Sequence, residues 1–388
     1  RAASYIVRNG PVTLQDRWEE DGGYSPFTLA VVVAGLLGAA DFADAAGENA
    51  IATHLRETAD MWNARIEAWT YVTGTSLARE VGVEGYYIRI APPEVADARS
   101  PAQGFVPIKN RPPGDSELPM VQLVSPDAVA LVRFGPRAAE DPRIVNTVKV
   151  IDALLKTDTV TGPLWHRYND DGYGEHADGS PFDGTGIGRG WPLLGGERAH
   201  YELAAGRPAE ADRLRKVMEA QAGVGGFFPE QVWDAPDMPE RELYNGRPSG
   251  SAMPLVWAHA EYIKLVRSLQ DGRVFDLPPQ TVERYQVQKR SSPHFLWRFT
   301  HKSRLLPVDK LLRIETLAPA QVHWSSDGWQ TVVDTDTRDT GLGLHVVDLP
   351  TSRLPPGTII RFTFYWPEAR RWEGTDFATQ MGAGLPPG

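Results

Sequence analysis

The spacing of hydrophobic residues changes near residue 275 and divides the chain into two parts. In residues 1–275 apolar side chains recur every three to four positions, which is the period of an amphipathic helix. The loops between these stretches are unusually long, which favours a functional role for them. The pattern predicts about seven helices paired as hairpins. They are expected at 28–46, 49–72, 127–134, 141–155, 197–205, 209–221 and 251–269.

Residues with strong preferences for helix ends support this assignment. Asp141 is a suitable N-cap, and Pro142 suits the first helical position. Glycine, which tolerates a left-handed backbone, follows three of the expected helices, at Gly206, Gly223 and Gly272. We therefore expect these helices to stop at or just before the glycines.

Residues 276–388 alternate instead between apolar and polar side chains, with turn residues at short intervals. Pro278 and Pro279 mark a linker at the start of this part. The alternating segments are 312–317, 321–324, 331–333, 344–347 and 359–366. The predicted fold class is therefore mainly α in residues 1–275, followed by a small all-β sandwich domain in residues 276–388.

The composition is that of a globular protein with an acidic charge balance. Hydrophobic residues make up 41% of the chain and charged residues 23%. Forty Lys and Arg against fifty Asp and Glu give a formal net charge of -10, which argues against nucleic acid as a partner. Twelve tryptophans and twelve tyrosines would suit stacking on a neutral sugar, although many of these rings must also fill the core.

Several classes of site are excluded or disfavoured. The absence of cysteine excludes disulfides, thiolate metal sites and cysteine nucleophiles. The histidines lack the spacing of a zinc site. Asp334, Asp336 and Asp339 resemble a loose calcium loop, although they depart from the calcium-hand pattern. No cofactor is expected to be required, and a structural calcium stays open. The longest apolar stretch, 29–40, is too short to predict a membrane partner.

The first chemistry-bearing group is the acidic tract at 16–20, in which Glu19 and Glu20 follow Trp18. A proton donor must be protonated at working pH, and an apolar wall or a like charge raises the pKa of a carboxyl group. Trp18 and Glu20 would supply such surroundings for an acid catalyst. Acidic residues at the start of a helix have the same composition, so this reading depends on the other groups.

The second group is the aromatic turn at 225–234, which contains Glu230, Gln231 and Trp233. Glu230 beside Gln231 suits a base that holds and activates a water molecule. A plain surface turn with one glutamate is the alternative. Hydrolysis of a sugar by inversion requires two opposed carboxyl groups about 6.5–9.5 Å apart, one to donate a proton and one to activate water.

A third group, at 165–174, combines Arg167 with Asp170 and Asp171. A guanidinium group and a carboxylate make charge-assisted hydrogen bonds that can grip sugar hydroxyls. The same residues also suit an Asp-Asp-Gly turn with the arginine as its partner. The spacing does not decide which aspartate would contact a sugar.

Taken jointly, these tracts are similar to the bacterial glucoamylase and glucodextranase family of inverting α-glucosidases, glycoside hydrolase family 15. The matching stretches are 15–26, 165–175, 190–198, 229–231 and 252–261. In the second part, 322–329 and 371–377 resemble the family's C-terminal domain. The resemblance spans nearly the whole chain and implies a catalytic domain of the (α/α)6 barrel type.

The resemblance also implies roles for the candidate residues. Glu19 matches the general acid and Glu230 the general base. The residues expected to bind substrate are Trp18, Glu20, Arg167, Asp170, Asp171 and Trp233. The implied activity is exo-hydrolysis of an α-glucan from its non-reducing end with release of β-glucose.

The linkage stays open between α-1,4, as in glucoamylase, and α-1,6, as in glucodextranase. One alternative is a trehalase-type hydrolase of the same family. Another is a non-catalytic glucan-binding subunit, against which the pairing of Glu19 with Glu230 argues. Degradation of a polysaccharide favours a secreted or periplasmic location.

One departure from the family concerns the number of helices. Residues 1–275 carry about half of the helices of an (α/α)6 barrel, and the proposed acid already lies at Glu19. Half a barrel would expose long apolar helix faces. The expectation is therefore that the chain is the C-terminal part of the barrel with its sandwich, and that an N-terminal fragment of the same enzyme binds as a second chain.

Overall fold

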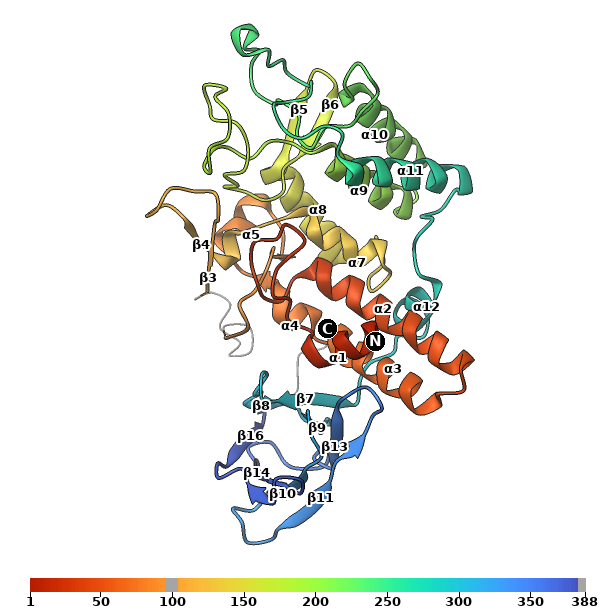
Figure 1. Cartoon of the computed structure of the whole chain (residues 1–388), viewed down its shortest axis with the longest axis vertical. Helices are drawn as coiled ribbons and strands as arrows, with labels where there is room; N and C mark the ends of the chain where they lie inside the picture. The colour runs from red at the N-terminus through yellow and green to blue at the C-terminus, as the bar shows by residue number, and fades with distance from the viewer. Residues whose placement is uncertain (95–103, 383–388) are drawn as a thin grey trace.

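The computed structural model describes residues 1–94 and 104–382 and consists of a helical part above a β part (Figure 1). The main helices of the first part are α1 (Ala2–Asn9), α2 (Pro26–Ala45), α3 (Asn49–Asn63), α4 (Ile66–Thr70), α5 (Ser76–Val81), α7 (Ala130–Arg133), α8 (Pro142–Leu155), α9 (Pro192–Ala204), α10 (Pro208–Gln221) and α11 (Val256–Asp271). α2 packs along α3, and α9, α10 and α11 pack together. Helices lie at or near the predicted positions, although α9 begins five residues earlier than predicted and α11 five residues later, and α1 and α5 were not predicted. Two of the predicted helices also differ in kind.

The first difference concerns the helix expected over 49–72. It is interrupted after Asn63, continues as α4 and gives way to strand β1 (Tyr71–Thr73). β1 pairs with β2 (Gly85–Tyr87), so strand pairing overrides the helical period there. The second difference is that the helix expected over 127–134 begins with a 3-10 turn, Pro126–Val129.

The helix ends follow the expected residues in three of four cases. The Asp141 carboxylate accepts a hydrogen bond of 2.9 Å from the backbone N–H of Arg143. Gly206 (φ +73°) and Gly272 (φ +66°) adopt the left-handed backbone at the ends of α9 and α11. α10 ends instead on Ala222, with an extended backbone (ψ 150°), rather than on Gly223 as predicted.

Short hairpins lie within the long loops. β3 (Phe105–Pro107) pairs with β4 (Glu117–Pro119), and β5 (Lys156–Thr159) pairs with β6 (Gly162–Trp165). Each strand has three or four residues, too few for a period to be read from the sequence. Two of the short strands precede arginines of the candidate site: β2 ends two residues before Arg89, and β6 ends two residues before Arg167.

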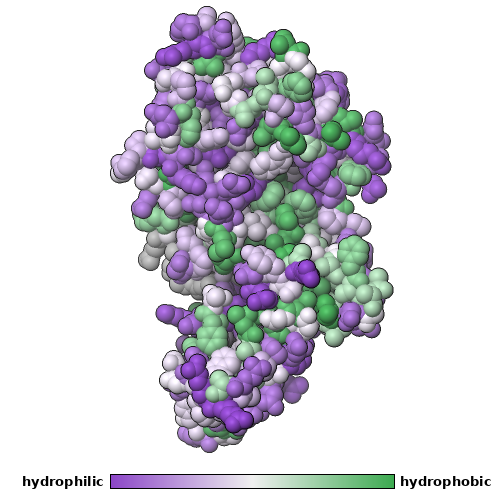
Figure 2. Space-filling model, in the orientation of Figure 1, coloured by the Kyte–Doolittle hydropathy of each residue, from purple (hydrophilic) through white to green (hydrophobic). Residues whose placement is uncertain are grey.

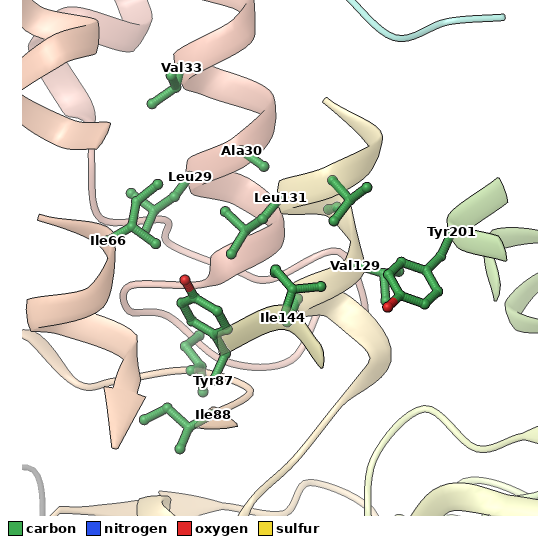
Figure 3. Packing of buried hydrophobic residues seen from close by; sticks show 14 of the residues in the cluster. Leu29, Ala30, Val33, Ile66, Tyr87, Ile88, Val129, Leu131, Ile144 and Tyr201 are labelled. Carbon is green, nitrogen blue, oxygen red and sulfur yellow. The ribbon is translucent and has the colours of Figure 1, made fainter. Parts of the chain in front are cut away.

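In the helical core α2 packs against α4 and α7, and buried residues of α8 belong to the same hydrophobic cluster. Figure 3 shows Leu29 and Ala30 of α2 close to Leu131 of α7. Tyr87 lies among the same side chains and donates its hydroxyl to Glu67 over 2.6 Å. Burial of these apolar side chains against one another holds the loops of the site on a rigid base.

α2 is, within the described ranges, the one helix long and apolar enough to cross a membrane by length and composition. The core helix of a globular domain passes the same test. Eight residues of α2 are buried, among them Leu29, Val33 and Leu37, which is typical of such a core helix.

The second part consists of two sheets. The four-stranded sheet has the order β12-β13-β9-β7, and the six-stranded sheet has the order β11-β10-β14-β16-β8 with β15 paired to β14. The strands are β7 (His294–Arg298), β8 (Leu305–Leu306), β9 (Leu311–Thr316), β10 (Gln321–Ser325), β11 (Val333–Asp336), β12 (Arg338–Asp339), β13 (His345–Leu349), β14 (Ile359–Trp366), β15 (Arg371–Trp372) and β16 (Phe377–Met381). Buried residues of both sheets form one hydrophobic cluster, as two face-to-face sheets do.

The four-stranded sheet contacts the helices. Arg313 of β9 pairs with Glu57 of α3 at 2.7 Å, and the guanidinium group of Arg65 lies 4.3 Å above the ring of Phe295 on β7. β10, β11 and β14 of the six-stranded sheet lie at the end of the molecule away from the helices (Figure 1). The six-stranded sheet therefore has an outer face directed away from the helical part.

The segment between the two parts packs on the helices. α12 (Pro279–Val282) is followed by a π-helical turn, Glu283–Val287. In this turn Arg284 binds Asp60 of α3 at 2.6 Å, and the Tyr285 hydroxyl donates to the same carboxylate over 3.1 Å. The domain boundary expected between residues 275 and 276 stays a prediction.

Candidate active site

A closed loop presents the acidic tract. Thr13 and Gly23 form a bridge at its base, with backbone hydrogen bonds of 2.9 and 3.0 Å. The Asp16 carboxylate accepts hydrogen bonds from the backbone N–H groups of Trp18 and Glu20, at 3.1 and 3.2 Å. Gly23 has a φ of +151°, and a Cβ there would lie 2.6 Å from the carbonyl oxygen of Ala91. Local hydrogen bonds and one close backbone approach thus define the shape of the loop.

Arg89 ties this loop to the body of the protein. Its side chain is fully buried and bonds to three carboxylates of the loop, Asp16 at 2.6 Å, Glu20 at 2.9 Å and Asp21 at 2.9 Å. Burial raises the pKa of Asp21 to about 6; Arg89 opposes this shift, while Asp16 and Glu20 add to it. Arg89 could not be identified as a site residue from the sequence, because it stands alone after β2 with no motif around it.

Glu20 connects Arg89 to Arg167. One oxygen of its carboxylate accepts a hydrogen bond of 3.0 Å from Arg167, and the other accepts one of 2.6 Å from the hydroxyl of Tyr168. The Glu20 side chain is only 4% exposed. Its charge is therefore compensated by two arginines.

The hydrogen bonds of Arg167 differ between Asp170 and Asp171, two aspartates between which the sequence did not decide. Its guanidinium group makes two hydrogen bonds to Asp171, at 2.8 and 2.7 Å, and Asp171 is buried. Asp170 is exposed, has a positive φ of 62°, and accepts a hydrogen bond of 3.1 Å from Asn169. Asp171 is thus the partner of Arg167, and Asp170 belongs to the turn.

Aromatic rings surround the Arg167 guanidinium group. Its carbon lies 5.3 Å from the ring centroid of Trp18, 4.8 Å from that of Tyr173 and 5.7 Å from that of Trp191. Trp18 contacts Trp191 edge to face at 5.3 Å and Trp257 at 5.5 Å. Trp18 of the acidic tract therefore shares one aromatic cluster with residues from three other segments.

Glu230 joins the same cluster from the opposite tract. The hydroxyl of Tyr173 donates a hydrogen bond of 3.3 Å to its carboxylate. Gln231 donates a hydrogen bond of 2.9 Å to the backbone oxygen of Tyr173, which aligns the two loops. Partial burial raises the pKa of Glu230, while the hydrogen bond from Tyr173 and the charge of Arg167 act to lower it. The two tracts that the sequence singled out are thus brought together through Tyr173 and Arg167.

Glu19 is exposed, unlike its neighbours. Its backbone lies in the left-handed region (φ 60°), which is uncommon for a residue with a side chain. Its carbonyl oxygen accepts a hydrogen bond of 3.0 Å from Lys109. Trp18 is buried, whereas the exposed side chain of Glu19 leaves its carboxylate accessible to a ligand.

A second charged network lies behind Trp18. Arg17 binds Asp127 at 2.7 Å and Glu197 at 2.5 Å, and its guanidinium carbon stands 4.5 Å from the Trp18 ring centroid. Burial raises the pKa of Glu197, and Arg17 counteracts this effect. This network therefore contacts the aromatic cluster at Trp18.

The burial of Trp233 contradicts the prediction that this residue binds substrate. Its side chain is fully buried, the Arg189 guanidinium carbon lies 4.1 Å from its ring centroid, and its indole N–H donates to the backbone oxygen of Pro236 over 2.8 Å. A ring without exposed surface cannot stack on a sugar. The sequence marked it because it follows Glu230 closely in an aromatic turn.

The structure does not gather the aspartates of the loose calcium loop into one ligand set. Asp334 bonds to His323 at 2.6 Å, Asp336 to Gln321 at 3.0 Å, and Asp339 accepts a hydrogen bond of 2.9 Å from the backbone N–H of Gly341. Among residues 1–94 and 104–382, no group of three or more His, Asp or Glu side chains is arranged to hold a metal ion.

The chain is similar to known proteins in sequence and in structure. A family model described as glycosyl hydrolases family 15 matches residues 1–267. The chain is 42% identical over 285 residues to a glucoamylase of Clostridium sp. strain G0005, a match that covers 73% of this chain and 37% of that protein. It is also 34% identical over 98 residues to a cycloisomaltooligosaccharide glucanotransferase of Niallia circulans, covering 22% of this chain and 10% of that protein.

Among solved structures, a bacterial glucoamylase complexed with acarbose is similar, with a TM-score of 0.65 and 42% identity. The match covers 73% of this chain and 39% of that structure. The chain thus spans less than half the length of the glucoamylases that it matches.

Proposed function

The chain belongs to the glycosyl hydrolases of family 15, and on that premise we propose that it hydrolyses α-glucans from their non-reducing ends and releases β-glucose by inversion. Two further observations support the proposal. Both carboxylate-bearing tracts meet at the Arg167 cluster, and relatives with 42% identity are glucoamylases. The observation that carries the proposal is the hydrogen bond from Tyr173 to Glu230 beside the ring of Trp191 and the guanidinium group of Arg167.

In the proposed mechanism Glu19 donates a proton to the glycosidic oxygen, and the glucosyl–oxygen bond breaks. Glu230 takes a proton from a water molecule, whose oxygen bonds to the anomeric carbon on the opposite face. The product is glucose of inverted configuration and a shortened glucan. The exposure of Glu19 suits contact with a leaving group, and the partial burial of Glu230 suits a base that must hold one water molecule.

We assign Arg167, Asp171 and Glu20 to the binding of the terminal sugar. Their charges are paired with one another before substrate arrives, so their orientation requires little rearrangement on binding. Trp18 is assigned to the wall of the same subsite. Asp170 is assigned a supporting role in the turn that carries Asp171.

The experiment is glucose release from maltooligosaccharides, isomaltooligosaccharides and trehalose, followed by proton NMR of the anomeric signal during the first turnovers. The expected product is β-glucose, and the preferred substrate decides between the α-1,4, α-1,6 and trehalase readings. Initial release of α-glucose would mean retention and would overturn the roles of Glu19 and Glu230.

We further propose that the helices are part of an (α/α)6 barrel, and that an N-terminal fragment of the same enzyme binds as a second chain. Exposed apolar side chains support this proposal. Phe42 on α2 is 81% exposed, and Val256 and Ile263 on α11 are 76% and 67% exposed. In the view of Figure 2, hydrophobic residues also gather at the level of α2 and α7. Surfaces of this kind usually lie against another element.

The barrel proposal is tested by native mass spectrometry of the chain purified from its source. The expected complex contains one second polypeptide whose peptides match the earlier part of a family 15 enzyme, and glucose release should require it. A monomeric chain with full activity, or a homodimer without the second polypeptide, would contradict the proposal.

We also propose a secreted or periplasmic location, because a polymeric glucan is degraded where it is met. The glucoamylase relatives support a polysaccharide substrate. Fractionation of the source cells tests this location, and recovery of the chain only in the cytoplasmic fraction would contradict it.

A further inference from the structure

The outer face of the six-stranded sheet carries an ordered set of side chains that the proposed active site does not use. β10 and β14 alternate, so Val322 and Phe362 point into the hydrophobic cluster while His323 and Thr363 point outward. His323 lies opposite Thr363 on one side and opposite Asp334 of β11 on the other. The outward side chains of three adjacent strands therefore form one surface.

This surface contains a shallow pocket of about 290 Å³. The pocket is lined by His323, Trp329, Thr363, Trp372 and Asp376. The imidazole of His323 stacks on Trp329 with ring centroids 5.6 Å apart and meets the edge of Trp372 at 5.3 Å. Two tryptophans on different strands and loops thus converge on one histidine.

The backbone at Trp329 is held in an unusual conformation. Trp329 has a φ of 71°, which is rare for a bulky side chain, and follows Gly328 at 74°. The hydroxyl of Ser325 accepts a hydrogen bond of 3.0 Å from the Trp329 N–H, and the Asp327 carboxylate accepts one of 2.9 Å from the Thr331 N–H. Strain that is maintained by such a local network is characteristic of functional positions. In this conformation the Trp329 ring stacks on His323.

Packing does not account for both pocket tryptophans. Trp324 is 8% exposed and belongs to the hydrophobic cluster, and Trp366 packs against that cluster and stacks on Phe364 at 5.5 Å. Trp372 is instead 50% exposed and contacts the side chains of Tyr365 and His323. A large ring left half in water on a sheet that already has a full core favours a binding role.

We infer that this pocket is a second sugar-binding site, which takes one or two glucose units of an α-glucan chain. The exposed faces of the tryptophans would stack on the apolar C–H face of a pyranose ring. The carboxylate of Asp376 and the hydroxyl oxygen of Thr363, which donates its own proton to the Thr375 carbonyl over 2.8 Å, would accept hydrogen bonds from sugar hydroxyls. Aromatic surfaces with a few polar groups of this kind are typical of small-ligand sites.

The charges around the pocket favour a neutral occupant over a cation. Asp334 is already paired with His323 at 2.6 Å, and Arg361 lies on the outer face of β14, two residues before Thr363. The strands β10 and β14, which contribute His323 and Thr363 to the pocket, lie at the end of the molecule away from the helices, so polymer bound there need not reach the Arg167 cluster (Figure 1). The choice of an α-glucan as occupant rests on the proposed function, because the polymer held would be the polymer hydrolysed.

The test is electrophoresis of the chain in native gels that contain amylopectin, dextran or no polymer. The Glu230→Gln background prevents degradation of the gel polymer. Trp372→Ala in this background is expected to weaken retardation about tenfold, as the loss of an aromatic stacking contact predicts. Trp372→Phe keeps a ring and is expected to lie between the two. Leu317→Ala, which alters an exposed side chain outside the pocket, is the matched control and should leave retardation unchanged.

Thermal unfolding of each variant checks that Trp372→Ala is folded, as its half-exposed position predicts. Equal retardation of the parent chain and Trp372→Ala would overturn the inference. Retardation by neither polymer, with binding of an arginine-rich peptide instead, would identify a cation site and overturn it as well. A chain that binds glucan through Trp372 but releases no glucose would refute the hydrolase proposal alone, whereas glucose release without Trp372-dependent binding would refute the pocket alone.

Discussion

The cluster around Arg167 and the outer face of the six-stranded sheet both contain tryptophans, but the two regions are built differently. In the cluster, the Arg89 and Arg167 side chains are 0% and 4% exposed, and each is bonded to carboxylates. On the sheet, Trp372 is 50% exposed and the polar groups around it are few. The first region is supported by buried ion pairs and the second by ring contacts.

The difference follows from what each region is proposed to do. Proton transfer requires carboxylates within narrow limits of distance and angle, which rigid, fully bonded neighbours provide. Holding a polymer requires only apolar contact area and tolerates sliding of the chain. We therefore expect substitutions in the Arg167 cluster to affect the rate of hydrolysis and the stability of the fold strongly. Substitutions on the sheet should affect only the affinity for glucan.

The largest effect is expected from the removal of a proposed catalytic carboxylate. Glu19→Gln and Glu230→Gln are each expected to lower kcat by about 10²–10⁴-fold, because proton donation or activation of water is lost. Steady-state glucose release measures the effect. Glu48→Gln, at an exposed position before α3, is the control. Turnover within about twofold of the parent in either variant would remove that residue from the mechanism.

Substitution of Arg89 tests whether its buried ion pairs with the acidic loop stabilise the candidate active site. Arg89→Met leaves Asp16, Glu20 and Asp21 without their shared partner, and the expected loss in free energy of unfolding is about 3–5 kcal/mol. Arg56→Met, which removes an exposed pair with Asp44, should cost less than about 1 kcal/mol. Urea denaturation measures both, and equal losses would contradict the distinction between buried and exposed pairs.

Removal of the Tyr173 hydroxyl tests the role of Glu230 through the pH dependence of activity. Its hydrogen bond acts to lower the pKa of Glu230, which burial raises. Tyr173→Phe should therefore raise that pKa further. Because the proposed base must be ionised, activity would then be lost at a higher pH as the solution is acidified.

The acidic limb of the profile of kcat/KM against pH reports this shift. Tyr244→Phe, at an exposed residue of the loop at 224–250, is the control and should leave the limb in place. An acidic limb that stays fixed or moves to lower pH in Tyr173→Phe would contradict the assignment of Glu230.

The smallest effect is expected from salt on glucan binding to the sheet. A neutral polymer held by ring contacts should keep its affinity within about twofold as ionic strength rises through the range in which exposed charges become screened. Native gels run at several salt concentrations measure this. A steep loss of retardation would indicate a charged ligand and would make the two regions more alike than proposed.

Much of the helical scaffold was predictable because burial imposes a period on it. α8 begins at Pro142 after the Asp141 cap, and α11 ends at Gly272, as the local signals indicated. The short hairpins were not predictable, because three or four residues carry no readable period and their partners come from tertiary contact. Arg89 was missed for a related reason, since a lone arginine acquires its meaning only from the three carboxylates around it.

The sequence by itself determined that acidic and aromatic tracts would lie in loops between helices, and that an alternating β region would follow, because periodicity and local hydrogen-bonding preferences act over a few residues. Only the tertiary structure decided that Asp171 rather than Asp170 pairs with Arg167, that Trp233 is buried, and that Tyr173 joins Glu230 to the cluster of Trp18. These outcomes depend on how distant segments share buried space and charge, which neighbouring residues along the chain do not encode.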